Sequence, residues 1–450
     1  MAAQASPIVT VADVVLRVSD VCSLEDLRGD SRLPPWISAD VSGTPSRRSG
    51  HPTGRAKILC VLGRYQYGQP SLGEGTEHAA FLPALARLGH TVVHFESRTR
   101  GAYRDFRELN RRLLQVVLSE KPDVLLAVPF ARELWLETIE IIGDLGVGTI
   151  CWTTDDSWKY PQQSRFLGHA FHCMTTTYPH VVPKYRRDGI TNVLLTQWAA
   201  RADKLQEPLP APQCEYAVTF VGAAHGSRPR RVARLRELGL QVECFGNGWP
   251  SGPVASDDIP RIMRQSVISL NFSNSYGDNQ LKARTFEVPG AGGFLLTEYA
   301  PNIERYYKPG LEIEVFGSLE QLVKTAKAYL ANPDRRDAVA WAGFERTRRE
   351  HTYDRRLSEV IDFALAHRPS SPSRTAAAAV RHFEILSAQH RVTPLLRLVR
   401  RTLVAPCKAI WGPQRGPRAA RRLLHELTWR FSRDGGYGAN GWVGRLFPDE

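Results

Sequence analysis

The sequence predicts an α/β fold built from two consecutive doubly wound domains. Strand-length apolar runs, such as Lys57–Leu62 and Tyr216–Gly222, are typical of parallel strands that helices cover on both faces. Each run leads through a loop into a helical pattern and then into another strand, which is the rhythm of βαβ units. The rhythm stops at the Pro-rich segment Pro208–Pro212 and starts again after it, so we expect two such domains.

The first domain continues from the strand Lys57–Leu62 with alternating helices and strands. The expected helices are 76–88, 104–119, 132–144 and 181–188. The expected further strands are 91–95, 122–128, 148–154, 170–176 and 191–195. Because parallel strands end at a common edge of their sheet, we expect ligand-binding residues in the loops that follow them.

The second domain repeats this pattern and then reaches a distinctive segment, Leu281–Glu298. The expected strands before this segment are 216–222, 241–245 and 266–272, and the expected helices are 229–238 and 258–265. The segment itself is predicted to form a helix that is broken at Gly290–Gly293 and followed by a short buried strand. We therefore expect a poorly ordered N-terminal extension (1–55), two Rossmann-like domains (56–210 and 213–368) and a basic helical C-terminal extension (369–450).

The net charge of the chain is +13, and most of it lies in one segment. Residues 391–433 contain eleven Lys or Arg and one acid, which leaves a net charge of 11 − 1 = +10 there and +3 elsewhere. This distribution argues against a nucleic-acid-binding core. Residues 393–404 and 418–431 alternate Leu or Val with Arg at helical spacing. Such helices suit an anionic membrane surface, or pack a Leu face on the protein and leave the Arg face in solvent.

Other sequence features indicate a cytoplasmic protein, with possible peripheral contact at the inner face of the membrane through residues 391–433. The chain has no transmembrane-length apolar run, and its N-terminus lacks the features of a signal peptide. The seven cysteines are scattered, which is typical of free thiols in a reducing compartment. Since no CxxC pair or His/Cys cluster is present, we predict no metal site. Walker and GxGxxG motifs are also missing, so we expect no bound cofactor.

Charged residues in two segments of the second domain suit a nucleotide sugar. Glu287 lies early in its predicted helix, where a carboxylate can bind the ribose hydroxyls, and Lys282 and Arg284 supply positive charge for a diphosphate. The loop from Gly222 leads to Arg228 at the start of a helix. Small residues there let the backbone approach a phosphate, and Arg can pair with it bidentately.

An ordered set of motifs in this region resembles the CgeB-type (spore-maturation-protein-like) glycosyltransferases of the group 1 family. The motifs are Arg284-Thr-Phe-Glu287, Leu295-Leu-Thr-Glu298, Tyr306-Tyr-Lys-Pro-Gly310, Asn332-Pro333 and His351-Thr-Tyr-Asp-Arg355. The resemblance covers roughly residues 56–366 and is clearest over 215–366. It implies a GT-B fold, in which two Rossmann-like domains face each other across a cleft.

The resemblance also implies an activity. Such an enzyme moves a sugar, without a metal ion, from a nucleoside-diphosphate sugar in the C-terminal domain to a hydroxyl group. The acceptor, bound by the N-terminal domain, would be a glycan, a lipid-linked molecule or a small molecule. We assign seven residues to the donor site: Gly222, Arg228, Asn279, Lys282, Arg284, Glu287 and Gly293.

Asn279 is a departure from the family pattern. Retaining group 1 enzymes carry two glutamates eight positions apart, and the position eight before Glu287 is Asn279. An amide can hydrogen-bond a sugar hydroxyl but offers no charge to an oxocarbenium-like transition state. Asn279 therefore favours one alternative to a transferase, a non-catalytic nucleotide- or sugar-binding protein of the same fold. A second alternative is a membrane-associated scaffold whose functional part is the basic C-terminal segment. A nucleotide-sugar epimerase shares this fold as well.

The acceptor side needs a base, and Asp155 and Asp156 are the first candidates. They directly follow a buried strand of the first domain, and two adjacent carboxyl groups can raise the pKa of one of them. Capping of a helix explains either residue equally well. Glu74, Glu77 and His78, which follow the first strand, are second candidates on the same side, although a lone His such as His78 is more often structural.

Overall fold

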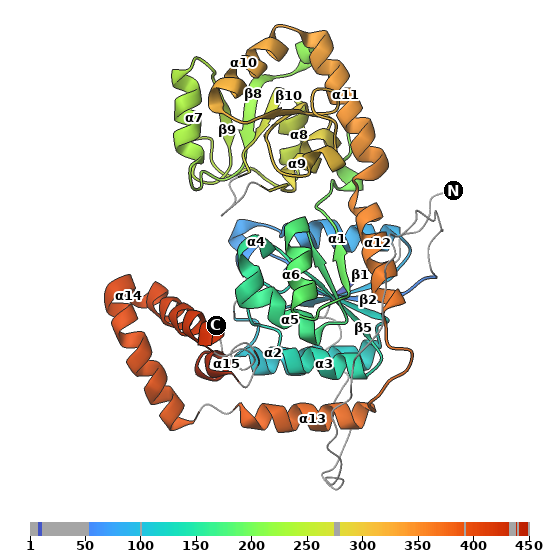
Figure 1. Ribbon diagram of the computed structural model, residues 1–450, viewed down its shortest axis with the longest axis vertical. Coiled ribbons are helices and arrows are strands. Elements are labelled where there is room, and N and C mark those ends of the chain that lie inside the picture. The colour runs from blue at the N-terminus through green and yellow to red at the C-terminus, as the bar shows by residue number, and fades with distance from the viewer. Residues whose placement is uncertain are drawn as a thin grey trace.

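The computed structural model describes residues 8–10, 54–99, 101–273, 280–390, 393–431, 438 and 441–448. Figure 1 shows two α/β domains stacked along the long axis of the molecule. In the described residues, the N-terminal domain contains a parallel sheet of seven strands in the order β1-β3-β2-β4-β5-β6-β7. These strands are β1 (Ile8–Thr10), β2 (Lys57–Leu62), β3 (Thr91–Glu96), β4 (Val124–Ala127), β5 (Gly148–Trp152), β6 (Cys173–Thr176) and β7 (Val193–Leu195).

Helices cover both faces of this sheet, as its apolar strands require. The first helices of the domain are α1 (Thr76–Arg87), α2 (Phe106–Glu120), α3 (Leu136–Asp144), α4 (Asp156–Lys159), α5 (Arg165–Ala170) and α6 (Val182–Arg187). Alternate residues of β2 enter different cores: Ile58 and Cys60 pack with α1, whereas Leu59 and Val61 pack with α2 and α3. All four side chains are fully buried, which explains why the strand is apolar throughout.

The C-terminal domain has a smaller sheet of the same kind. Its five described strands are parallel, in the order β12-β11-β10-β8-β9. They are β8 (Tyr216–Val221), β9 (Glu243–Phe245), β10 (Ser266–Asn271), β11 (Leu295–Glu298) and β12 (Glu314–Phe316). The helices are α7 (Arg228–Glu237), α8 (Asp258–Arg264), α9 (Arg284–Gly290), α10 (Leu319–Leu330) and α11 (Pro333–Glu350). Together with the first domain, this arrangement is the GT-B fold that the resemblance predicted.

The chain returns to the N-terminal domain after α11. Helix α12 (Tyr353–Ala366) packs on α1, and its residues Tyr353 and Leu357 lie in the core beneath β2. A backbone bridge between Ala200 and Thr352 joins the two segments that connect the domains. Figure 1 shows both connections on the same side of the molecule. The range expected for the second domain, 213–368, therefore includes a helix that packs with the first.

The expected extensions also contact the N-terminal domain. Helix α13 (Ala376–Gln389) packs on α2 and α3 through Ala379, Phe383 and Leu386. Helix α14 (Pro394–Phe431) bends at Gly412, whose φ is 80°, and α15 (Trp442–Leu446) packs against it. At the other end, β1 pairs in parallel with β3. The rest of the expected extension, up to residue 53, lies outside the described residues.

Candidate functional site

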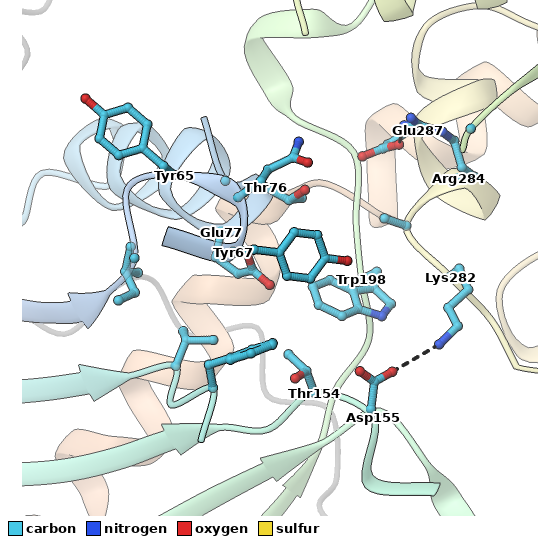
Figure 2. Close-up of a pocket in the computed structure, with 18 of the residues that line it drawn as sticks. Tyr65, Tyr67, Thr76, Glu77, Thr154, Asp155, Trp198, Lys282, Arg284 and Glu287 are labelled. Atoms are coloured by element: carbon cyan, nitrogen blue, oxygen red, sulfur yellow. Dashed lines mark hydrogen bonds and ion pairs between the residues drawn. The ribbon is translucent and has the colours of Figure 1, made fainter. Parts of the chain in front are cut away.

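The two domains enclose a cavity of about 530 Å³ at the carboxyl ends of their central strands. The N-terminal wall comes from the loops after β2, β3, β4 and β5, and the C-terminal wall comes from residues after β8 and β10 and from α9. Figure 2 shows Tyr67, Glu77 and Asp155 entering from one domain, and Lys282, Arg284 and Glu287 from the other. This is the edge at which open α/β sheets bind ligands.

The C-terminal wall is basic, and its cations are held by backbone groups and by Glu287. The Nε of Arg284 donates to the carbonyl oxygen of Val221 at 3.2 Å, and its guanidinium contacts the Glu287 carboxylate one turn further along α9. Lys282 precedes the helix and also lines the cavity. The segment that was predicted to bind a nucleotide sugar therefore does present Lys282, Arg284 and Glu287 to one cavity.

Arg228 lies beside this group, in an unfavourable electrostatic position. Its guanidinium donates to the carbonyl oxygens of Ala223 and Phe272 at 3.2 and 3.3 Å, while its Nε is buried without a partner among the described residues. Burial lowers the pKa of Arg228, and the nearby guanidinium groups of Arg284 and Arg231 lower it further. A partly desolvated cation next to two others is a site that an anion would stabilise.

The N-terminal wall carries two carboxylates. Asp155 adopts a left-handed conformation (φ 59°) just before α4, and its Oδ1 lies 3.4 Å from the Nζ of Lys282 across the cavity (Figure 2). Glu77 lies in the first turn of α1. Burial raises the pKa of Glu77, although the positive charges of Arg98 and Lys159 act in the opposite direction. A carboxylate with a raised pKa at a cavity wall is suited to accept a proton.

Several residues of the N-terminal wall were not predicted as site residues. Arg98, just after β3, stacks its guanidinium 3.5 Å from the ring centre of Phe130, which follows β4. Tyr67 and Trp198 add two further aromatic rings. Gly68 lets the loop after β2 pass Arg98, because a Cβ there would lie 2.2 Å from the Arg98 carbonyl oxygen. The strand-end positions of Arg98 and Phe130 were the signal that could have identified them, since Asp155 occupies the equivalent position after β5.

Asp156 does not lie in the cavity. It is fully buried, and its carboxylate accepts hydrogen bonds from the hydroxyl groups of Thr153 (2.7 Å), Ser164 (2.5 Å) and Tyr185 (2.9 Å). Burial raises its pKa, and these hydrogen bonds oppose the rise. We therefore correct the assignment of Asp156: it holds together the segments that follow β5 and β6 and does not face a substrate.

Of the three remaining donor-site residues, one lines the cavity, one is buried outside it, and one lies outside the described residues. Gly293 is buried outside the cavity, and a Cβ on it would lie 2.6 Å from the carbonyl oxygen of Met263. Its role is therefore close packing of the chain between α9 and β11, which corrects the expectation of donor contact. Gly222 does line the cavity and accepts a 2.7 Å hydrogen bond from the Trp249 indole. Asn279 lies outside the described residues.

Comparison with known proteins identifies the C-terminal region. Residues 228–362 match the family described as glycosyl transferase-like. The prediction of a glycosyltransferase is confirmed at this level, and the match includes Arg228, Lys282, Arg284 and Glu287. It does not distinguish the CgeB-type enzymes from other members. No curated protein sequence matches the chain.

Solved structures with similar architecture share little sequence with the chain. Sucrose-phosphate synthase from Thermosynechococcus elongatus has 12% identity and a TM-score of 0.47 over 69% of this chain and 100% of its own. A glycosyltransferase from Rickettsia africae has 10% identity and a TM-score of 0.49 over 70% and 99%. HepE from Anabaena, solved in complex with UDP, has 11% identity and a TM-score of 0.43 over 68% and 99%. Identities this low carry no information about the substrates of this chain.

Among the described residues, no group of three or more His, Cys, Asp or Glu side chains is arranged to hold a metal ion. Likewise, none of the described helices is long and apolar enough to cross a membrane.

Proposed function

We propose that the chain transfers a sugar from a nucleoside-diphosphate sugar to a hydroxyl group of an acceptor. The observation that carries this proposal is the position of Arg228. A partly desolvated guanidinium with a buried, unpartnered Nε lies next to Arg284 at the end of a β-strand, in a cavity that also contains Glu287. Arg284 pairs with Glu287 and Arg231 pairs with Glu298, whereas Arg228 has no carboxylate partner among the described residues. A diphosphate would supply negative charge to Arg228.

The donor would lie against the C-terminal wall. Arg228, Arg284 and Lys282 would bind the diphosphate, and the Glu287 carboxylate would accept hydrogen bonds from the ribose hydroxyls. The cavity volume of about 530 Å³ is within the range of small-molecule sites. These side chains can stabilise the leaving diphosphate without a divalent cation, which is why we propose a metal-independent reaction. We retain the CgeB-type subfamily as part of this proposal because of the motifs around Glu287.

The acceptor would enter along the N-terminal wall. Its hydroxyl oxygen attacks the anomeric carbon, the bond from that carbon to the diphosphate oxygen breaks, and the hydroxyl proton passes to a carboxylate. Glu77 and Asp155 are the carboxylates of the N-terminal wall, and Glu77 has the raised pKa that favours proton acceptance. Tyr67, Phe130 and Trp198 offer aromatic faces on which a sugar ring can stack.

Thermal unfolding with a panel of nucleotides tests the donor site. UDP, GDP, dTDP, ADP and their sugar conjugates are added to the wild type and to Glu287→Ala. A ligand at about 100 times its Kd stabilises the folded protein by roughly 2.7 kcal/mol. We expect one diphosphate series to stabilise the wild type and to have a smaller effect on the variant. If no nucleotide stabilises the wild type, the proposed donor site is wrong. If a nucleotide series stabilises both proteins equally, Glu287 does not contact the nucleotide.

A further inference from the structure

Helix α14 exposes an unusual number of large apolar side chains. Of the eighteen such side chains that are exposed in the described residues, eight lie within residues 393–448. They are Leu395, Leu398, Leu403, Ile410, Trp411, Leu423, Leu427 and Trp442. Leu395 and Leu398 are 69% and 58% exposed and three residues apart, so they share one face of the helix. Leu423 and Leu427 are four residues apart and form a second exposed pair.

These residues are not the packed side of the helix. The two arms of α14, which meet at Gly412, enclose a separate small core with α15. That core contains Leu396, Val404, Cys407, Ala420, Leu446 and Phe447. The two arms of α14 thus form a helical hairpin, the α14 hairpin, whose inner side is packed. Other apolar side chains remain exposed on its outer surface. Figure 1 shows this hairpin beside the N-terminal domain.

The same outer surface is strongly basic. Residues 393–431 contain nine Lys or Arg and one acid, Glu426, and Glu426 is paired with Arg430. Exposed basic residues occur on both arms, for example Arg397 and Arg401 on the first and Arg422 on the second. Positive charge alone would suit nucleic acid as well. A phosphate backbone gains nothing, however, from exposed aliphatic side chains such as Leu395.

We infer that the α14 hairpin docks on a membrane surface that carries anionic phospholipids. The basic residues would interact with the headgroups, and the exposed Leu, Ile and Trp side chains would enter the boundary between headgroups and acyl chains. This is the combination of charge and apolar area that distinguishes an interfacial helix from a solvated one.

The hairpin is attached close to the N-terminal wall of the cavity. The Nη2 of Arg132 lies 2.6 Å from the Nδ1 of His425 on the second arm, and Arg132 is two residues from Phe130, which lines the cavity. Helix α14 also contacts the helical turn Tyr160–Ser164, which follows Asp155 and α4. A docked hairpin would therefore hold the acceptor wall near the lipid surface. Resting on the proposed transferase function, we infer further that the acceptor is a membrane-borne hydroxyl compound.

Co-sedimentation of the full chain with large vesicles tests the docking. Vesicles of phosphatidylcholine alone are compared with vesicles that also contain phosphatidylglycerol, at low and high salt. We expect binding to the anionic vesicles only, weakened by salt because the screening length shortens. Binding is measured without nucleotide, so a failure of the proposed donor site would leave this result unchanged. No sedimentation with anionic vesicles would overturn the inference.

Two triple variants of equal net charge distinguish the effect of the α14 surface on vesicle binding from the effect of the total charge of the protein. The triple variant Arg397→Gln, Arg401→Gln, Arg422→Gln should bind anionic vesicles about 100-fold more weakly, since each basic residue contributes roughly fivefold. The control triple, which changes the exposed Arg234, Arg348 and Arg355 to Gln, alters the net charge equally and should bind as the wild type does. Equal losses in both triples would overturn the assignment to α14. Tighter binding to single-stranded RNA than to anionic vesicles would also overturn it.

The apolar contribution and the acceptor are tested in the same way. Leu395→Ser with Leu398→Ser should weaken vesicle binding about tenfold or more, whereas Leu311→Ser, at an equally exposed site in the C-terminal domain, should not. For the acceptor, transfer of radiolabelled sugar to vesicles made from a bacterial lipid extract is measured. The Arg triple should reduce this transfer about as much as it reduces vesicle binding, at unchanged nucleotide affinity. Equal transfer by the wild type and the triple would refute a membrane-borne acceptor.

Discussion

The substitution Arg228→Gln separates binding of a diphosphate from stability of the fold. Removing the guanidinium removes at least one charge-assisted hydrogen bond to the diphosphate, and the loss of one such bond, about 1.5–3 kcal/mol, should lower the affinity roughly 10- to 150-fold. Folding should change little. The variant loses the hydrogen bonds from Arg228 to the carbonyl oxygens of Ala223 and Phe272, which contribute about 1 kcal/mol each. It also loses the desolvation of Arg228 and its repulsion by Arg284 and Arg231, and this gain offsets the lost bonds. We expect the free energy of unfolding to change by about 1 kcal/mol or less.

Titration calorimetry with the nucleoside diphosphate that stabilises the wild type measures the affinity, and urea unfolding measures the stability. Arg230→Gln is the matched control, since Arg230 is exposed on the same helix and its loss changes the net charge equally. It should leave the affinity within about twofold of the wild type because exposed charges are screened by salt. If both variants weaken binding equally, Arg228 does not contact the diphosphate. If the nucleoside without phosphates binds as tightly, the cationic cluster is not a diphosphate site.

Three further substitutions test other residues. Glu77→Gln should lower turnover about 100-fold or more with little effect on donor affinity. Burial raises the pKa of Glu77, so wild-type activity should begin to fall at a higher pH on the acid side than it would with an ordinary Glu. The same raised pKa means that ionisation of Glu77 destabilises the folded protein as pH rises. Glu77→Gln should therefore have the higher Tm at neutral pH. Asp156→Asn should lower the free energy of unfolding by about 1–3 kcal/mol in urea titrations while nucleotide affinity persists; an unchanged stability would contradict its structural role. Gly293→Ala should destabilise by about 1–3 kcal/mol, because its Cβ would overlap the Met263 carbonyl oxygen, and an unaltered Tm would show that the contact relaxes freely.

The sequence predicted the strands β2 to β11 and the helices α1, α2, α3, α6, α7, α8 and α9, because each of these elements is locally determined. The elements β1, β12, α4, α5 and α10 to α12 were not among those expected. Strands buried on both faces must be apolar along their whole length, and Ile58–Leu62 is buried throughout. The return of α12 to the first domain was not predictable in this way. Its buried residues, such as Tyr353 and Leu357, form an ordinary amphipathic pattern that fits either domain. Only the packing on α1, far away in sequence, decides between them.

The basic half of the site was predictable, and the acidic half was predictable only in part. Lys282, Arg284 and Glu287 lie within two helical turns of one another, so their spacing already places them together. Asp155 and Asp156 are adjacent, yet one lies in the cavity and the other in the core. The left-handed backbone of Asp155 separates them, and no pattern of residue types reveals that conformation.

The two connections between the domains determine how the cavity can open. The amide of Ala200 donates to the carbonyl oxygen of His351 at 2.8 Å, and the amide of Tyr353 donates to that of Ala200 at 2.9 Å. Because both crossings are tied together at this one place, the domains have a common pivot and are expected to rotate about it rather than slide past each other. Lys282 and Asp155 lie on opposite sides of the cavity, so we expect that rotation of one domain away from the other breaks their ion pair. Exchange of substrate and product would then follow a swinging motion about Ala200 and Thr352.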